Sequence, residues 1–217
     1  MNPIVECRTP SPLDHSRPRH ARRAAVLRAV LILAVVFAAP ALHSQTLVVT
    51  STSPSGPGSL EAAIDQVNAT PEQETIVFSL PGTGTVKIPL RAGTEITDRL
   101  IIDGYSVAGA SPNAAVGRSN TATLRVQIEI TPGVNPSARS EVRFLEEIEI
   151  RGIAFTATGV PARMTFACGN DFFDCDFARL VGNYIGADPG GAPSPQPLEI
   201  NIARSGNEPW DGVRIGS

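Results

Sequence analysis

The chain has 217 residues, with 18 Lys and Arg, 21 Asp and Glu, and a formal net charge of −3. Six of the basic and two of the acidic residues lie in residues 1–44, which leaves 12 basic and 19 acidic residues and a net charge of −7 beyond them. All three histidines also lie in 1–44, so the rest of the chain cannot build a Ser–His–Asp triad or a His-ligated zinc site. An acidic chain without a basic patch also argues against nucleic-acid binding.

Residues 1–44 have the pattern of a secretory signal. A leader rich in arginine precedes an uncharged apolar run at 29–39, AVLILAVVFAA, and small residues follow Pro40. The run is shorter than the roughly 20 residues that a membrane span needs. We therefore expect export, with cleavage after Ala41 or Ser44 and no transmembrane anchor afterwards. An uncleaved anchor is the alternative.

The next element is an amphipathic helix, predicted over 59–68 in GPGSLEAAIDQVNAT. Ser59 is a good N-cap after a Gly- and Pro-rich turn, and Asn68 and Pro71 end the helix. The apolar positions follow the helical spacing i, i+3, i+4, i+7 and form one stripe: Leu60, Ala63, Ile64 and Val67.

Most of the remaining elements read as short strands. In TLRVQIEI (123–130), Leu and the β-branched residues alternate with Thr, Arg, Gln and Glu, so we expect one buried face per strand. The expected strands are Thr46–Thr50, Thr75–Ser79, Thr85–Leu90, Arg99–Asp103, Thr123–Ile130, Glu147–Phe155, Ala178–Tyr184 and Leu198–Ala203.

The spacing of these strands favours a solenoid. Apolar cores followed by Gly, Asn or Asp recur about every 20–30 residues, a period typical of stacked repeats. A β-sandwich is the competing architecture, but tight Asn-Gly or Asp-Gly hairpins between adjacent strands are scarce. A solenoid needs a lid over its open end, and the helix has the apolar and polar sides of such a cap. A partner-binding helix is the alternative.

Three motifs carry a resemblance to a known family. The stretches VTSTSPSGPGSLEAAIDQVNATPEQETIVFSLPGTGTVKI, LIIDGYSVAGASPN and LVGNYIGADPGG occur in this order. Together they resemble the N-terminal module and first rungs of secreted bacterial right-handed parallel β-helix proteins. Glu61 stands where the family usually has Arg, and the GNYIG unit appears once where longer relatives repeat it.

The resemblance implies an all-β right-handed parallel β-helix, exported to the periplasm or outer surface of a bacterium. The expected organisation is a signal peptide at 1–44, an N-terminal cap at 45–93 and β-helix rungs at 94–217. DGVRIGS at the end looks like the start of another rung, so we expect a continuing reading frame, a strand-adding partner or a weakly ordered tail.

Turn residues follow several of the apolar cores. Gly104, Gly182, Gly152 and Gly186 suit turns that need a positive φ. Asn183 follows LVG at a bend, where a stacked asparagine side chain can satisfy backbone groups. We interpret these residues as structural.

The best functional cluster is Asp171, Asp174 and Asp176 in GNDFFDCDF, whose carboxylates would suit Ca²⁺. Lyases of this fold use Asp-bound calcium with an Arg or Lys base, for which Arg163 or Arg179 would serve, and hydrolases use clustered Asp residues as acid and base. The favoured interpretation is simpler: a turn residue and two solvated acids on a strand.

Cys168 and Cys175 flank the same segment. In an oxidising compartment, two cysteines seven positions apart around a Gly-Asn turn are expected to form a disulfide. Two free thiols, one of them buried, are the alternative.

Two functions from different classes follow. The favoured one is a non-catalytic scaffold, adhesion or carbohydrate-contacting module with no catalytic residues and no cofactor, whose partners are polysaccharide or envelope components. The alternative is a polysaccharide lyase or glycoside hydrolase, or part of one, that acts on an acidic polysaccharide with Ca²⁺.

Overall fold

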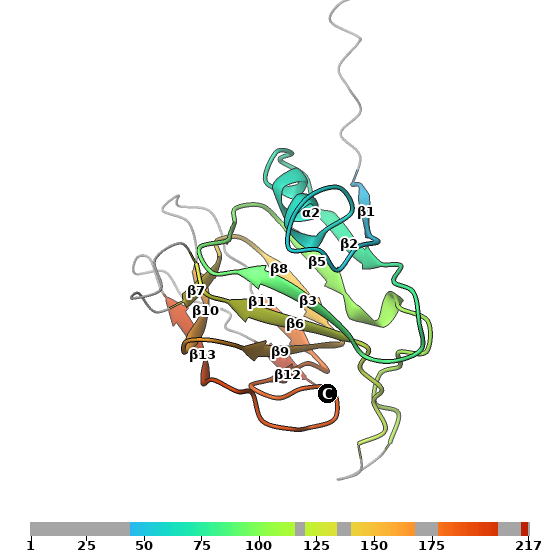
Figure 1. Cartoon of the computed structure of the whole chain (residues 1–217). Coiled ribbons are helices and arrows are strands. Elements are labelled where there is room, and N and C mark those ends of the chain that lie inside the picture. Colours follow the sequence, from blue (N-terminus) through green and yellow to red (C-terminus); the bar gives the residue numbers. More distant parts are fainter. Residues whose placement is uncertain (1–43, 116–119, 134–139, 168–177, 204–213, 217) are drawn as a thin grey trace, which may run out of the picture. The chain divides into compact units, whose positions relative to one another are not determined.

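A computed structural model describes residues 44–115, 120–133, 140–167, 178–203 and 214–216. The described part is all-β and compatible with a parallel β-helix, with one α-helix, α2 (Leu60–Val67), and a 3-10 turn, η1 (Gly104–Ser106) (Figure 1). The strands form three sheets. The expectation of an all-β chain is confirmed.

Every ladder between named strands is parallel. From β2 onward, each strand pairs with the strand three places further along, so consecutive strands enter different sheets. Among the described strands, this excludes the hairpin pairing of a sandwich.

The first sheet has the order β1-β2-β5-β8-β11-β14. Side chains of β2, β5, β8 and β11 alternate between the interior and the outer face, which gives an interior row of Leu47, Ile76, Ile102, Ile150 and Leu180 in register. The strands are β1 (Thr46–Val49), β2 (Glu74–Phe78), β5 (Leu100–Asp103), β8 (Ile148–Arg151), β11 (Ala178–Val181) and β14 (Arg214–Gly216).

The other two sheets have the orders β12-β9-β6-β3 and β13-β10-β7-β4. In the latter, the rings of Phe144 and Phe166 stack with centroids 4.7 Å apart. The strands are β3 (Val86–Arg91), β6 (Val126–Thr131), β9 (Ile153–Ala157), β12 (Tyr184–Ile185), β4 (Glu95–Ile96), β7 (Ser140–Phe144), β10 (Ala162–Ala167) and β13 (Leu198–Ala203).

The helix α2 forms for the expected reasons. The Ser59 side chain accepts a hydrogen bond from Ala62 N, and the four residues of the apolar stripe are buried in the common core. Its C-cap, Asn68, reaches the edge strand β4: Nδ2 donates to Glu95 O at 2.8 Å and Oδ1 accepts from Thr97 N at 2.9 Å. The side chain thus satisfies backbone groups at a sheet edge.

Two expected strands are each divided at a glycine. The segment expected as Glu147–Phe155 is β8 and β9, separated by Gly152 with φ 68°, and Ala178–Tyr184 is β11 and β12, separated by Gly182 with φ 60°. A positive φ turns the chain from one sheet into the next. Strands β4, β7 and β10 were not among the expected strands: β4 has only two residues, and β7 carries charged residues at alternate positions. β14 falls in DGVRIGS, the segment expected to begin another rung.

The expectation of one buried face per strand is wrong at β6 and its N-terminal flank. Arg125 and Gln127 are only 7% and 3% exposed although they lie on the polar side of the alternation. Arg125 donates to the carbonyls of Gly82, Gly84 and Ala108, so loops cover this side of the strand. Gln127 Nε2 donates to Thr156 Oγ1 at 2.9 Å.

Candidate functional site

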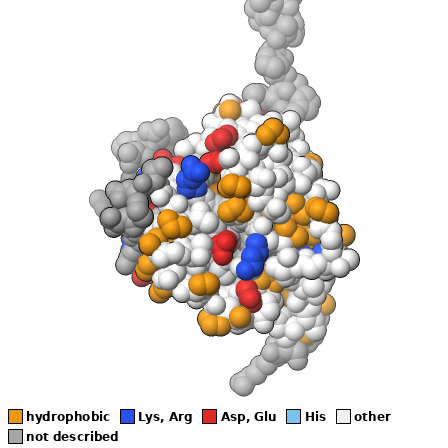
Figure 2. Space-filling model, in the orientation of Figure 1, with side chains coloured by type: hydrophobic (Ala, Val, Ile, Leu, Met, Phe, Trp, Pro, Cys, Tyr) orange, Lys and Arg blue, Asp and Glu red, His pale blue; other side chains and the backbone are white. Residues whose placement is uncertain are grey.

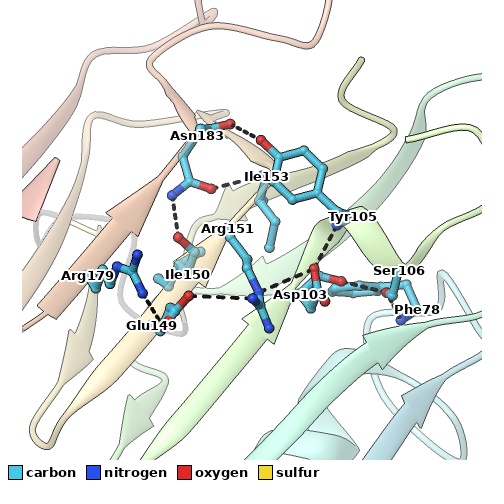
Figure 3. Close-up of polar contacts among 11 residues, drawn as sticks. Phe78, Asp103, Tyr105, Ser106, Glu149, Ile150, Arg151, Ile153, Arg179 and Asn183 are labelled. Atoms are coloured by element: carbon cyan, nitrogen blue, oxygen red, sulfur yellow. Dashed lines mark hydrogen bonds and ion pairs between the residues drawn. The ribbon is translucent and has the colours of Figure 1, made fainter. Parts of the chain in front are cut away.

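The outer face of β5, β8 and β11 carries a ladder of charged side chains (Figure 3). Register places Asp103 beside Arg151 and Glu149 beside Arg179. Arg151 Nε lies 3.6 Å from Asp103 Oδ1, Arg151 Nη1 lies 3.7 Å from Glu149 Oε1, and Arg179 Nη1 lies 3.3 Å from Glu149 Oε2. Two acids and two arginines form one charge-balanced row, named here the outer ladder.

The outer ladder is better suited to binding than to acid–base chemistry. Its side chains are partly exposed, so each ion pair adds little stability. A hydrolase needs one carboxyl group that holds a proton and a second that acts as base or nucleophile. Asp103 and Glu149 instead both lie within ion-pair distance of the same guanidinium group, that of Arg151.

A tyrosine lies at the end of this ladder. Tyr105 follows β5, its backbone N donates to Asp103 Oδ1 at 3.0 Å, and its hydroxyl donates to Gly182 O at 3.3 Å. A Cβ on Gly152 would lie 2.7 Å from Tyr105 Cδ1, and one on Gly182 would meet the hydroxyl. The ring therefore packs over the two turns at Gly152 and Gly182, where the backbone carries no side chains. This place, where the chain passes from one sheet to the next, is called the corner below.

The environment of Tyr105 keeps its hydroxyl protonated. Burial raises its pKa above the ordinary 10.0, and the nearby Tyr184 and Asp103 act in the same direction. Tyr184 in turn accepts a hydrogen bond from Asn120 Nδ2 at 2.6 Å. The chain has two tyrosines, and the fold brings both to this corner from positions 79 residues apart.

Asn183 lies at the same corner and ties two turns together. Its Oδ1 accepts from Ile153 N at 2.9 Å, and its Nδ2 donates to Ile150 O at 2.7 Å. These bonds satisfy backbone groups on either side of the Gly152 turn. The asparagine does not have a positive φ.

Gly104 departs from the expected backbone conformation. Its φ is not positive, unlike those of Gly152, Gly182 and Gly186. A Cβ at this position would collide with the carbonyl of Gly152. Glycine is needed there because two turns approach closely, not because of backbone handedness.

A second set of charged pairs follows the sheet of β4, β7, β10 and β13. Arg143 Nη1 lies 2.7 Å from Glu95 Oε1, and Arg163 Nη2 lies 3.3 Å from Glu199 Oε2. The Thr165 hydroxyl donates to Glu141.

The face drawn in Figure 2 shows few charged side chains, scattered among neutral and apolar ones.

Several residues singled out in the sequence lie outside the described residues. These are Asp171, Asp174 and Asp176, together with Cys168 and Cys175. The two arginines considered as a base both lie within ion-pair distance of glutamates, Arg163 with Glu199 and Arg179 with Glu149. Among the residues that are described, no group of three or more side chains is arranged to hold a metal ion.

Sequence reasoning did not select Tyr105, Arg151 or Tyr184 as a group. The scarcity of tyrosine was the available signal, but strand register decides that the two side chains lie near each other. In the described part of the chain, no helix has the length and apolarity required to cross a bilayer.

Comparison with known proteins does not assign the chain to a family. No family model, curated protein or solved structure matches the chain.

Proposed function

We propose that the chain is a right-handed parallel β-helix whose first coil is closed by α2. The step of three strands between paired strands supports a coil of three sheets per turn. The buried stripe of α2 and its contact with the edge of β4 through Asn68 support a capping role. The signal-like segment at 1–44 supports export to the periplasm or the outer surface of a bacterium.

We further propose that it acts as a non-catalytic scaffold that contacts a polysaccharide of the cell envelope. The observation that carries this is the outer ladder with Tyr105 at its end. Guanidinium groups donate to sugar hydroxyls, carboxylates accept from them, and a regular row of such groups suits a polymer with repeating hydroxyls. Because the ladder is charge-balanced, a neutral polysaccharide is the expected ligand.

Retention on immobilised polysaccharides tests this function. We expect the wild-type chain to be retained on at least one neutral envelope polysaccharide, and the double variant Arg151→Ala/Arg179→Ala to lose at least about tenfold in affinity, because donors of the ladder are removed. Arg143→Ala, which removes a pair from a different sheet, is the matched control and should bind like wild type. Equal binding by the double variant and wild type would contradict the proposed surface.

The alternative is a Ca²⁺-dependent lyase or hydrolase that uses the three acids between β10 and β11. Three carboxylates within six residues favour it. Acidic polysaccharides incubated with the chain and Ca²⁺ would release ultraviolet-absorbing unsaturated products in the lyase case, or reducing ends in the hydrolase case. Products that disappear with a chelator and with Asp174→Ala would overturn the scaffold proposal.

A further inference from the structure

Along one sheet, the row of interior side chains ends in an exposed residue on the last described strand. In the sheet β4-β7-β10-β13, interior positions in register are Ile96, Phe144, Phe166 and Ile202. The first three are at most 2% exposed, whereas Ile202 is 51% exposed. β13 is the terminal strand of this sheet, so one of its edges is not part of any ladder among the described strands.

The opposite end of the molecule cannot cover this surface. There α2 buries its apolar stripe and turns Asp65 and Gln66 toward solvent. A polar helix face over Ile202 would leave the apolar surface unmatched and desolvate a charge. Head-to-tail stacking of two copies is therefore disfavoured.

The β13 sequence LEINIA is complementary to itself in an antiparallel pair. With Asn201 on a two-fold axis, Ile200 of one copy faces Ile202 of the other on the interior side, and Asn201 faces Asn201 on the outer side. The two Glu199 residues then lie four positions apart along the strands, about 13 Å, which avoids a like-charge contact. The pairing also gives hydrogen-bond partners to the backbone N–H and C=O groups along the edges of both strands.

We propose that two copies of the chain associate end to end through β13, which joins their apolar interiors across a two-fold axis. The contact is isologous and closes at a dimer. It does not depend on the outer ladder, the proposed polysaccharide-binding surface, which lies on a different sheet.

Sedimentation equilibrium of the full chain tests the dimer. We expect wild type to dimerise and Ile202→Asp to raise the dimer dissociation constant at least about tenfold, because a carboxylate would be buried opposite Ile200. Val48→Asp is the matched control, since Val48 on β1 is the other large exposed apolar residue, at 48% exposure, and should leave the dimer unchanged. Circular dichroism checks that the variants fold.

A cross-linking experiment tests the register independently. In a background in which Cys7, Cys168 and Cys175 are replaced by Ser, Asn201→Cys should form a disulfide-linked dimer on mild oxidation, and Glu199→Cys should not. A monomer at all concentrations, open-ended oligomers, or equal cross-linking at both positions would overturn the proposal.

Discussion

At the scale of single residues, the corner beside β5, β8 and β11 depends on missing side chains. Gly152 and Gly182 both have positive φ, and both leave room for the Tyr105 side chain. Positive φ alone would favour glycine or asparagine. The nearby tyrosine side chain is a second, independent reason, because it leaves no room for a Cβ. Each glycine is therefore required both by its positive φ and by the packing of Tyr105.

This double demand predicts different costs for two glycines. Gly152→Ala should lower the free energy of unfolding by about 1–3 kcal/mol more than Gly186→Ala, measured by urea denaturation. Both substitutions strain a positive φ, but a Cβ at Gly186 meets no atom within 4 Å, whereas one at Gly152 meets the ring. Tyr105→Ala should reduce the difference between the two. Equal costs in the wild-type background would contradict the packing role.

At the scale of elements, α2 is held at both of its ends. Ser59 caps the first turn, and Asn68 joins the last turn to β4. The helix has eight residues, too few to be stable alone in water, so it depends on its buried stripe and on these end contacts.

Asn68→Ala should therefore destabilise the fold by about 1–2 kcal/mol, because two hydrogen bonds to the backbone of the β4 region are lost. Asp65→Ala, on the exposed face of the same helix, should change stability by less than about 0.5 kcal/mol. Thermal and urea denaturation provide the measurement. A cost for Asp65→Ala equal to that of Asn68→Ala would argue against the contact with β4.

At the scale of the whole described fold, stability is expected to vary with position along each sheet. β5, β6, β7 and β8 have a hydrogen-bonded neighbour on both sides, whereas β1 and β13 have one. Opening a terminal strand breaks one ladder, but opening a central strand breaks two.

Hydrogen–deuterium exchange should follow this order. We expect backbone amides of β5 and β8 to exchange at least about tenfold more slowly than those of β1. Dilution below the dimer dissociation constant should speed exchange in β13 and leave β1 unchanged. Uniform protection across β1, β5 and β8 would contradict stepwise opening.

The sequence by itself determined the all-β character, the limits of α2, its cap and its apolar stripe, because these follow from local periodicity and hydrogen bonding. It also placed interior positions such as Ile128 and Ile150 through their alternation with polar residues. It did not predict short strands such as β4, and it predicted two single strands where the chain turns at Gly152 and Gly182 into another sheet. The reason is that a residue's neighbour in a parallel ladder is about 20–50 residues away, so the pairing leaves no local signal.

The tertiary structure alone decided which outward residues meet. Asp103 faces Arg151, and Tyr105 reaches Gly182, because register between coils fixes these contacts and sequence spacing does not. The burial of Arg125 is also decided by tertiary structure, because loops from elsewhere in the chain supply the carbonyls that accept its hydrogen bonds. Local patterns set which face of a strand is apolar, whereas the stacking of distant segments sets what the other face contacts.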